Sequence, residues 1–97
     1  MDKQRKPASK EELRRQRNEL YAAIERGELS LRHAVKRMRA LTRMTQPGFA
    51  AHRGVSVKVI KEIERGVGIS TLNTLNQIAE IFGLEVAFVR KDRLRSD

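Results

Sequence analysis

The chain has 97 residues, no cysteine, no tryptophan and a formal net charge of +9. This is the length of one modest domain, with little spare volume for a deep substrate pocket. Without cysteine, a disulfide scaffold and a thiolate zinc site are excluded. No stretch resembles a signal peptide or an apolar span of about 20 residues, so we expect a soluble cytoplasmic protein without a membrane partner.

The positive charge is concentrated in the middle of the chain. Residues 30–66 carry nine basic and two acidic side chains, a net charge of +7. Residues 1–29 carry a net charge of +2, and residues 67–97 are neutral. A polyanion suits such a segment, because neutralised phosphates release condensed counterions. The alternative is a solvated basic surface that aids solubility, and charge alone leaves both open.

The N-terminal third is predicted to hold an arm and one accessory helix. Residues 1–8 are polar, basic and interrupted by proline, which predicts a disordered basic arm. Within residues 9–29, Ser9 and Glu12 have the spacing of a capping box, and Gly27 ends the helix. Its apolar residues at helical spacing are Leu13, Leu20, Ala23 and Ile24. Because this stripe is thin, the helix must pack on the rest of the chain or on a second copy.

Four capping residues divide residues 30–83 into helices. The caps are Ser30, Thr45, Ser56 and, for a last helix that runs to about Phe82, Thr71. Glycines 54, 66 and 83 end three of these helices, as residues that tolerate positive φ commonly do. The residues expected to face a common core are Leu31, Val35, Met38, Leu41, Phe49, Ala50, Val59 or Ile60, Ile63, Leu72, Leu75, Ile78, Ala79 and Phe82.

The last apolar stretch, residues 84–90, has a different pattern. It is rich in β-branched and aromatic residues and partly alternates, which predicts a short strand. A lone strand has no partner in a helical chain. We therefore expect it to pair with the same strand of a second copy, with Leu84, Val86 and Phe88 as dimerisation residues. A continuing helix is the alternative, and residues 91–97 are expected to form a flexible tail.

Two short capped helices are joined at Gly54, where the chain must turn sharply. Val55 is expected to fill the core beneath the turn. Ser56 exposes the start of the next helix, whose positive dipole end suits a phosphate-lined groove. Ile60 and Ile63 take the core face of that helix. The side chains that point away, and are candidates to read base edges, are Val57, Lys58, Lys61 and Glu62.

The stretch from Val35 to about Leu84 resembles the Xre or phage-repressor family of helix-turn-helix domains, and possibly its HipB-like antitoxin subtype. The residues that carry the resemblance are Met44-Thr45-Gln46, Phe49-Ala50, Gly54-Val55-Ser56, Ile60, Ile63-Glu64-Arg65-Gly66, Leu72-Asn73-Thr74-Leu75 and Ile78-Ala79-Glu80-Ile81-Phe82-Gly83. The resemblance implies an all-α fold. We expect a five-helix lambda-repressor-like bundle with an extra N-terminal helix and a short C-terminal β-strand. It also implies a homodimer that binds a double-stranded DNA operator on a bacterial or phage nucleoid.

The resemblance assigns roles by position. Gln46 matches a residue that contacts a phosphate and supports the reading side chains. Arg39 and Glu64 match a partly buried ion pair, for which two unrelated surface charges are the alternative. Further phosphate contacts are expected from Arg43, His52, Arg53, Arg65, Thr71 and Asn73, of which either of the last two could simply cap its helix. Pro47 and Gly48 depart from the family pattern and weaken the first helical turn, so we expect Gln46 to sit differently.

Each reading residue has a chemical preference. Lys58 can donate to guanine, Glu62 can accept from the amino group of cytosine, and Val57 can pack on a thymine methyl group. Alternatively, Glu62 is a solvated partner of Lys58 one helical turn away. Lys58 and Lys61 could also touch phosphates alone, which position a protein without specifying sequence.

These features predict a sequence-specific transcriptional regulator, a dimeric autorepressor of a palindromic operator. The alternative is an antitoxin that neutralises a cognate protein toxin and represses its own operon. An enzyme is not expected, because there is no carboxylate pair, no nucleophile with a base and no phosphate-binding loop. No metal site or cofactor is expected, since His33 and His52 are far apart and lack companions.

Overall fold

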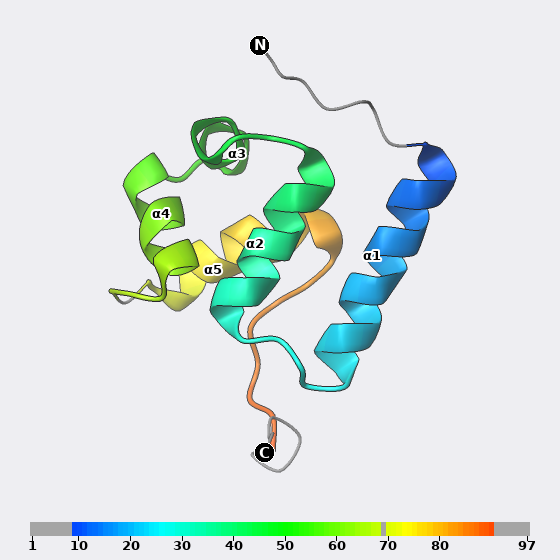
Figure 1. The fold of residues 1–97 in the computed structure, drawn as a ribbon. Coiled ribbons are helices and arrows are strands. Elements are labelled where there is room, and N and C mark those ends of the chain that lie inside the picture. Colours follow the sequence, from blue (N-terminus) through cyan, green and yellow to red (C-terminus); the bar gives the residue numbers. More distant parts are fainter. Residues whose placement is uncertain (1–8, 69, 91–97) are drawn as a thin grey trace.

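The computed structural model describes residues 9–68 and 70–90. All regular structure in these residues is helical (Figure 1). The elements are α1 (Lys10–Glu25), α2 (Leu31–Thr42), α3 (Gln46–Arg53), α4 (Val57–Arg65), α5 (Leu72–Ala79) and the short 3-10 helix η1 (Glu80–Phe82). None of these helices has the length and apolar character needed to cross a lipid bilayer.

Each α-helix begins at the cap that the sequence predicts. The side-chain oxygen of the cap accepts a hydrogen bond from the backbone N–H three residues later. Such a bond satisfies one donor that the start of a helix leaves unpaired. The five caps are Ser9, Ser30, Thr45, Ser56 and Thr71. The helix boundaries therefore follow from local chemistry.

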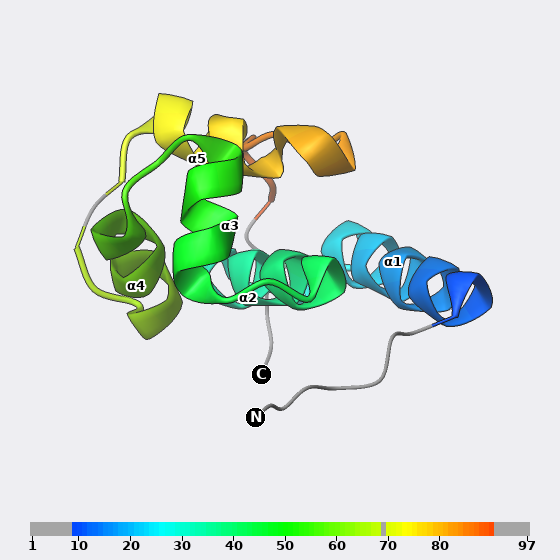
Figure 2. The same ribbon diagram turned by 90° about the horizontal axis from the view of Figure 1, so that it is seen from above.

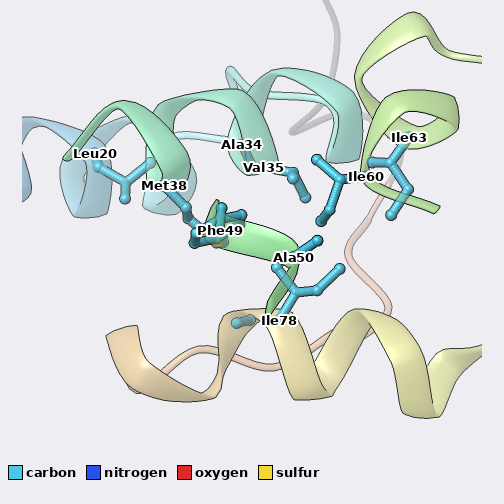
Figure 3. Packing of buried hydrophobic residues seen from close by; sticks show 10 residues of the cluster. Leu20, Ala34, Val35, Met38, Phe49, Ala50, Ile60, Ile63 and Ile78 are labelled. Atoms are coloured by element: carbon cyan, nitrogen blue, oxygen red, sulfur yellow. The ribbon is translucent and has the colours of Figure 1, made fainter. Parts of the chain in front are cut away.

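One hydrophobic core joins all five α-helices. Its four fully buried large side chains are Leu20, Phe49, Ile60 and Ile78. Figure 3 shows Phe49 between Met38 and Ile78, with Leu20 reaching in from α1. Burial of one such side chain contributes about 1.5–3 kcal/mol, so these contacts hold together helices that are individually too short to be stable.

The predicted N-terminal helix is formed and belongs to this bundle. In the described residues α1 is one of five α-helices, and it packs against α2. Leu20 is fully buried, and Tyr21 Oη donates to the carbonyl oxygen of Phe82 at 2.8 Å. The thin apolar stripe is thus covered by the chain itself.

Two residues expected in the core lie at the surface. Leu31 is 52% exposed and Leu72 is 58% exposed. Each is the first residue of its helix, directly after the cap. At this position the side chain lies at the end of the bundle, where the neighbouring helices do not cover it. The remaining residues of the predicted core are buried or partly buried.

Residues 84–90 form neither a strand nor a helix in this single chain. Gly83, with φ of +68°, ends η1 and rules out a continuing helix. The predicted strand is not formed, because a strand needs a ladder partner. Leu84 packs against the core, and the backbone N–H of Val86 donates to Asn76 Oδ1 at 2.7 Å. The predicted arm and tail lie outside the described residues.

Candidate nucleic-acid interface

The two helices of the predicted motif share one side of the molecule. Figure 2 looks down on this side. There α3 runs vertically in the plane of the picture, and α4 is seen from its N-terminal end. In Figure 1 the end of α2 and the start of α1 reach the same side. The first turn of α4 therefore presents its unpaired N–H groups and its positive dipole end at the surface.

The orientation of α4 follows from its two faces. Ile60 is fully buried and Ile63 is nearly so, which turns the opposite face outward. The turn before the helix is closed by Gly54, with φ of +73°, and by a bond of 2.9 Å from the N–H of Val55 to the carbonyl oxygen of Ala50. Glycine adopts this left-handed backbone conformation more easily than any other residue.

Three of the four predicted base-reading residues present charged groups on the outward face. The side chain of Lys58 is 82% exposed, Lys61 is exposed, and the side chain of Glu62 is 38% exposed. Lys58 Nζ lies 4.0 Å from Glu62 Oε2, so these residues form an exposed pair. Such a pair contributes little stability and separates easily. Val57 differs, because it is half-buried and packs partly against the core.

Beneath this face lies a polar cluster that joins α2, α3 and α4. Glu64 is 4% exposed, and among the residues that the structure describes it is the one charged residue that is buried. Arg39 donates to it from Nε at 2.8 Å and from Nη2 at 2.9 Å, in a two-bond arrangement. Gln46 Nε2 donates to Glu64 Oε1 at 3.1 Å. Arg39 also donates to the carbonyl oxygen of Met44 at 3.1 Å. We call Arg39, Gln46 and Glu64 the ion-pair cluster.

The charges in the ion-pair cluster stabilise each other. Burial by itself raises the pKa of Glu64. The hydrogen bonds from Arg39 and Gln46, together with the positive charges of Arg39 and Lys36, lower the pKa by more than burial raises it. The net result is a pKa below the ordinary value. The hydrogen bond to Glu64 raises the pKa of Arg39. The carboxylate is therefore ionised at neutral pH although it is buried.

Gln46 has a different position from the one expected of a phosphate-contacting residue. Its amide nitrogen points to Glu64 within the cluster. Helix α3 nevertheless begins regularly, because Thr45 caps it and accepts from the N–H of Gly48 at 3.1 Å. Proline is compatible with the first helical turn, where its missing N–H would have no helical partner. The Pro47-Gly48 departure therefore leaves the helix intact.

The other predicted phosphate-contacting residues fall into two groups. His52, Arg65, Arg43 and Asn73 are exposed. Thr71 is the cap of α5 and accepts from the N–H of Thr74 at 3.1 Å. The side chain of Arg53 is only 11% exposed, and its guanidinium donates to the carbonyl oxygen of Gln77. Two groups of this guanidinium, Nε and Nη2, are thus engaged within the chain.

Sequence reasoning missed two side chains that hold the motif in place. Arg32 Nε donates to the carbonyl oxygen of Glu64 at 3.0 Å and so satisfies an acceptor in the last turn of α4. Gln77 hydrogen-bonds to the turn between α3 and α4. A signal for Arg32 existed, because it lies seven residues before Arg39, on the same face of α2. For Gln77 there was no such signal.

No three potential metal-ligating side chains come together in the described part of the chain. No known protein family, curated protein or solved structure matches this chain. The functional argument therefore rests on the geometry above and on the distribution of charge along the sequence.

Proposed function

We propose that this chain is a sequence-specific DNA-binding regulator of transcription, of the helix-turn-helix class, that acts in the cytoplasm. Helix α4 is its recognition helix. The observation that carries the proposal is the outward face of α4, on which Lys58 and Lys61 are exposed. The net charge of +7 over residues 30–66 adds the attraction that a phosphate backbone requires.

The ion-pair cluster supports this proposal. Replacing a buried ion pair by apolar residues is often neutral or stabilising, and the best-attested use of such pairs is to fix one arrangement. Here the arrangement is that of α3 and α4 relative to α2, joined through Arg39, Gln46 and Glu64. A protein that reads DNA needs this orientation, because an α-helix must enter the major groove at a defined angle.

In the proposed complex the first two turns of α4 lie in the major groove. Lys58 donates to guanine and Glu62 accepts from cytosine, once their mutual contact is broken. The exposed part of Val57 packs on a thymine methyl group. Lys61 and Arg65 contact phosphates, which position the helix without specifying sequence.

The regulator acts as a homodimer on a palindromic operator. One copy presents one recognition helix, and a dimer places two of them about 34 Å apart on the same face of the duplex. Phe88 is fully exposed and Val89 is 51% exposed, in a segment that is anchored upstream by Leu84. Contiguous exposed apolar surface marks interaction sites, and these two residues are neighbours in the chain. Pairing of residues 84–90 between two copies would form the missing strand and cover Phe88.

Selection of bound duplexes from a random DNA pool tests this function. The expected result is enrichment of one palindromic sequence, with a footprint on it and an affinity that falls steeply with salt. Equal binding to every duplex, including the DNA upstream of its own gene, would contradict the proposal. Gel filtration with light scattering checks the dimer, and Phe88→Ser is expected to shift it to monomer.

A second function, neutralisation of a protein toxin, is favoured by one observation. Leu31 is 52% exposed and Val67 is 46% exposed, and both line a hollow of about 300 Å³ together with Ile63 and Leu75. Leu31 starts α2 and Val67 follows α4, so the hollow lies away from the start of α4 (Figure 1). Co-purification with the product of a neighbouring gene, lost on Leu31→Ser, tests this function.

A further inference from the structure

The end of α3 is fastened to α5 by two side chains that bond to each other's backbone. Arg53 donates to the carbonyl oxygen of Gln77 from Nε at 3.2 Å and from Nη2 at 2.8 Å. In return, Gln77 Nε2 donates to the carbonyl oxygens of Arg53 at 2.8 Å and of Gly54 at 3.2 Å. We call these four bonds the Arg53–Gln77 clasp.

The clasp acts directly on the turn between α3 and α4. The last carbonyl groups of a helix have no partner within that helix, and the amide of Gln77 serves two of them at this turn. A Cβ atom on Gly54 would lie 2.8 Å from Gln77 Nε2, so the amide rests against the backbone of the turn. Gln77 is on α5, one residue before the fully buried Ile78. The turn is thereby tied to a helix that the core holds in place.

We propose that Arg53 and Gln77 are positioning residues for α4: the clasp sets the direction in which the recognition helix leaves the turn. The proposal rests on the function proposed above. It assigns Arg53 a role different from a phosphate contact, which the basic character of residues 30–66 had suggested. DNA affinity then depends on the clasp without contact between the clasp and DNA.

A positioning role and a phosphate contact of Arg53 differ in their chemistry, so an experiment can distinguish them. A planar guanidinium holds a carbonyl oxygen with two N–H groups, whereas the ammonium group of lysine is a point charge that binds a phosphate equally well. Loss of a phosphate contact lowers the slope of log affinity against log salt concentration by about 0.9. Loss of a positioning contact leaves that slope unchanged and lowers the affinity for the correct sequence.

The experiment compares Arg53→Lys, Arg53→Ala, Gln77→Met and the double variant of Arg53→Lys with Gln77→Met against the full-length wild type. Arg26→Lys is the matched control, because Arg26 pairs with Glu28 at the surface and takes no part in the clasp. The probes are the duplex selected by the wild type and a random duplex of equal length. Circular dichroism first shows that each variant is folded at the temperature of the binding measurement.

Each single variant is expected to bind the selected duplex roughly tenfold more weakly, consistent with the loss of one or two hydrogen bonds. Binding to the random duplex and the salt slope stay as in the wild type. Each single variant loses two of the four bonds, because each side chain bonds to the backbone of the other segment, so the double variant is expected to bind more weakly than either single. Wild-type binding by Arg53→Lys, or a slope lowered by about 0.9 in Arg53→Ala but not in Arg53→Lys, would overturn the proposal.

A measurement without DNA separates this proposal from the proposed function. Backbone amide chemical shifts of α4 are recorded for the wild type and for Gln77→Met. Loss of the clasp is expected to shift the amides of residues 57–61, which follow the turn that Gln77 bonds to. Unchanged shifts in α4 would refute the positioning role even if the wild type binds DNA. A wild type that prefers no DNA sequence, with shifted α4 amides, would instead refute the proposed function.

Discussion

The carboxylate of Glu64 receives two hydrogen bonds from the guanidinium of Arg39, at 2.8 and 2.9 Å, across the interface of α4 and α2. The two residues are 25 positions apart in the chain. Because the carboxylate is almost completely buried, its partner is essential: an unpaired buried charge costs far more than the pair itself contributes. The consequences can be measured.

Arg39→Ala is expected to lower the free energy of unfolding by about 3 kcal/mol, because it leaves a buried carboxylate without its main partner. Arg15→Ala is the matched control, since Arg15 pairs with Glu12 and Glu19 at the surface. Its expected cost is under about 1 kcal/mol. Chemical denaturation measures both. Equal losses would show that the pair of Arg39 and Glu64 behaves as a surface pair.

The lowered pKa of Glu64 predicts a dependence of stability on pH. A carboxyl group whose pKa is lower in the folded state stabilises the fold above its unfolded value of about 4.3, and this contribution is lost as the pH falls through the folded value. The stability difference between wild type and Glu64→Gln should therefore be constant from pH 8 to 6 and decrease in acid. A difference that grows below pH 4 would contradict the sign.

Gly54→Ala is expected to destabilise the fold more than Gly83→Ala. Both glycines have positive φ, +73° and +68°, so both substitutions carry a conformational cost of about 1–2 kcal/mol. Only at Gly54 would the new Cβ meet another group, Gln77 Nε2 at 2.8 Å. Thermal unfolding of the two variants isolates this clash. Equal melting temperatures would mean that the amide moves aside at no cost.

Leu20→Ala is expected to cost about 2–5 kcal/mol, as for other large side chains removed from a core. Leu31→Ala is the control, because Leu31 is half exposed and its removal leaves no cavity. The loss for Leu20 should appear in one cooperative transition of the whole chain. A separate early transition of α1 would show that α1 is independent of the remaining helices.

Substitutions on α4 should distinguish side chains that contact bases from side chains that contact phosphates. Lys58→Ala is expected to relax the preference at one base pair by about 1–3 kcal/mol. Arg65→Ala is expected to weaken binding to all sequences and to lower the salt slope by about 0.9. Competition with single-base variants of the selected duplex measures the first effect. A uniform loss for Lys58→Ala would make Lys58 a phosphate contact.

The sequence predicted the local features well because they depend on neighbouring residues. A polar residue accepts from the N–H three positions later, as at Ser56, and the spacing of Ile60 and Ile63 defines a buried face. The exposure of Leu31 and Leu72 was missed, since periodicity identifies a face but does not show where the bundle ends.

Long-range polar contacts were less predictable. The position of Arg53 was missed, because an arginine in a basic segment looks the same whether its donors meet a phosphate or a carbonyl group. The ion pair of Arg39 and Glu64 was expected only through the resemblance to a family, since nothing local links residues 25 positions apart. The strand predicted at residues 84–90 is not formed in the single chain, where this segment has no ladder partner.

The bond from Tyr21 to the carbonyl oxygen of Phe82 has a practical meaning for protein engineering. It joins the second half of the first helix to the last helical turn. A fragment that begins at Ser30, the cap of α2, would lose this bond and Leu20 together. The portable unit for fusion to another protein therefore includes α1 and extends through Leu84 and Val86, over residues 9–86, and a linker should be attached outside these bounds.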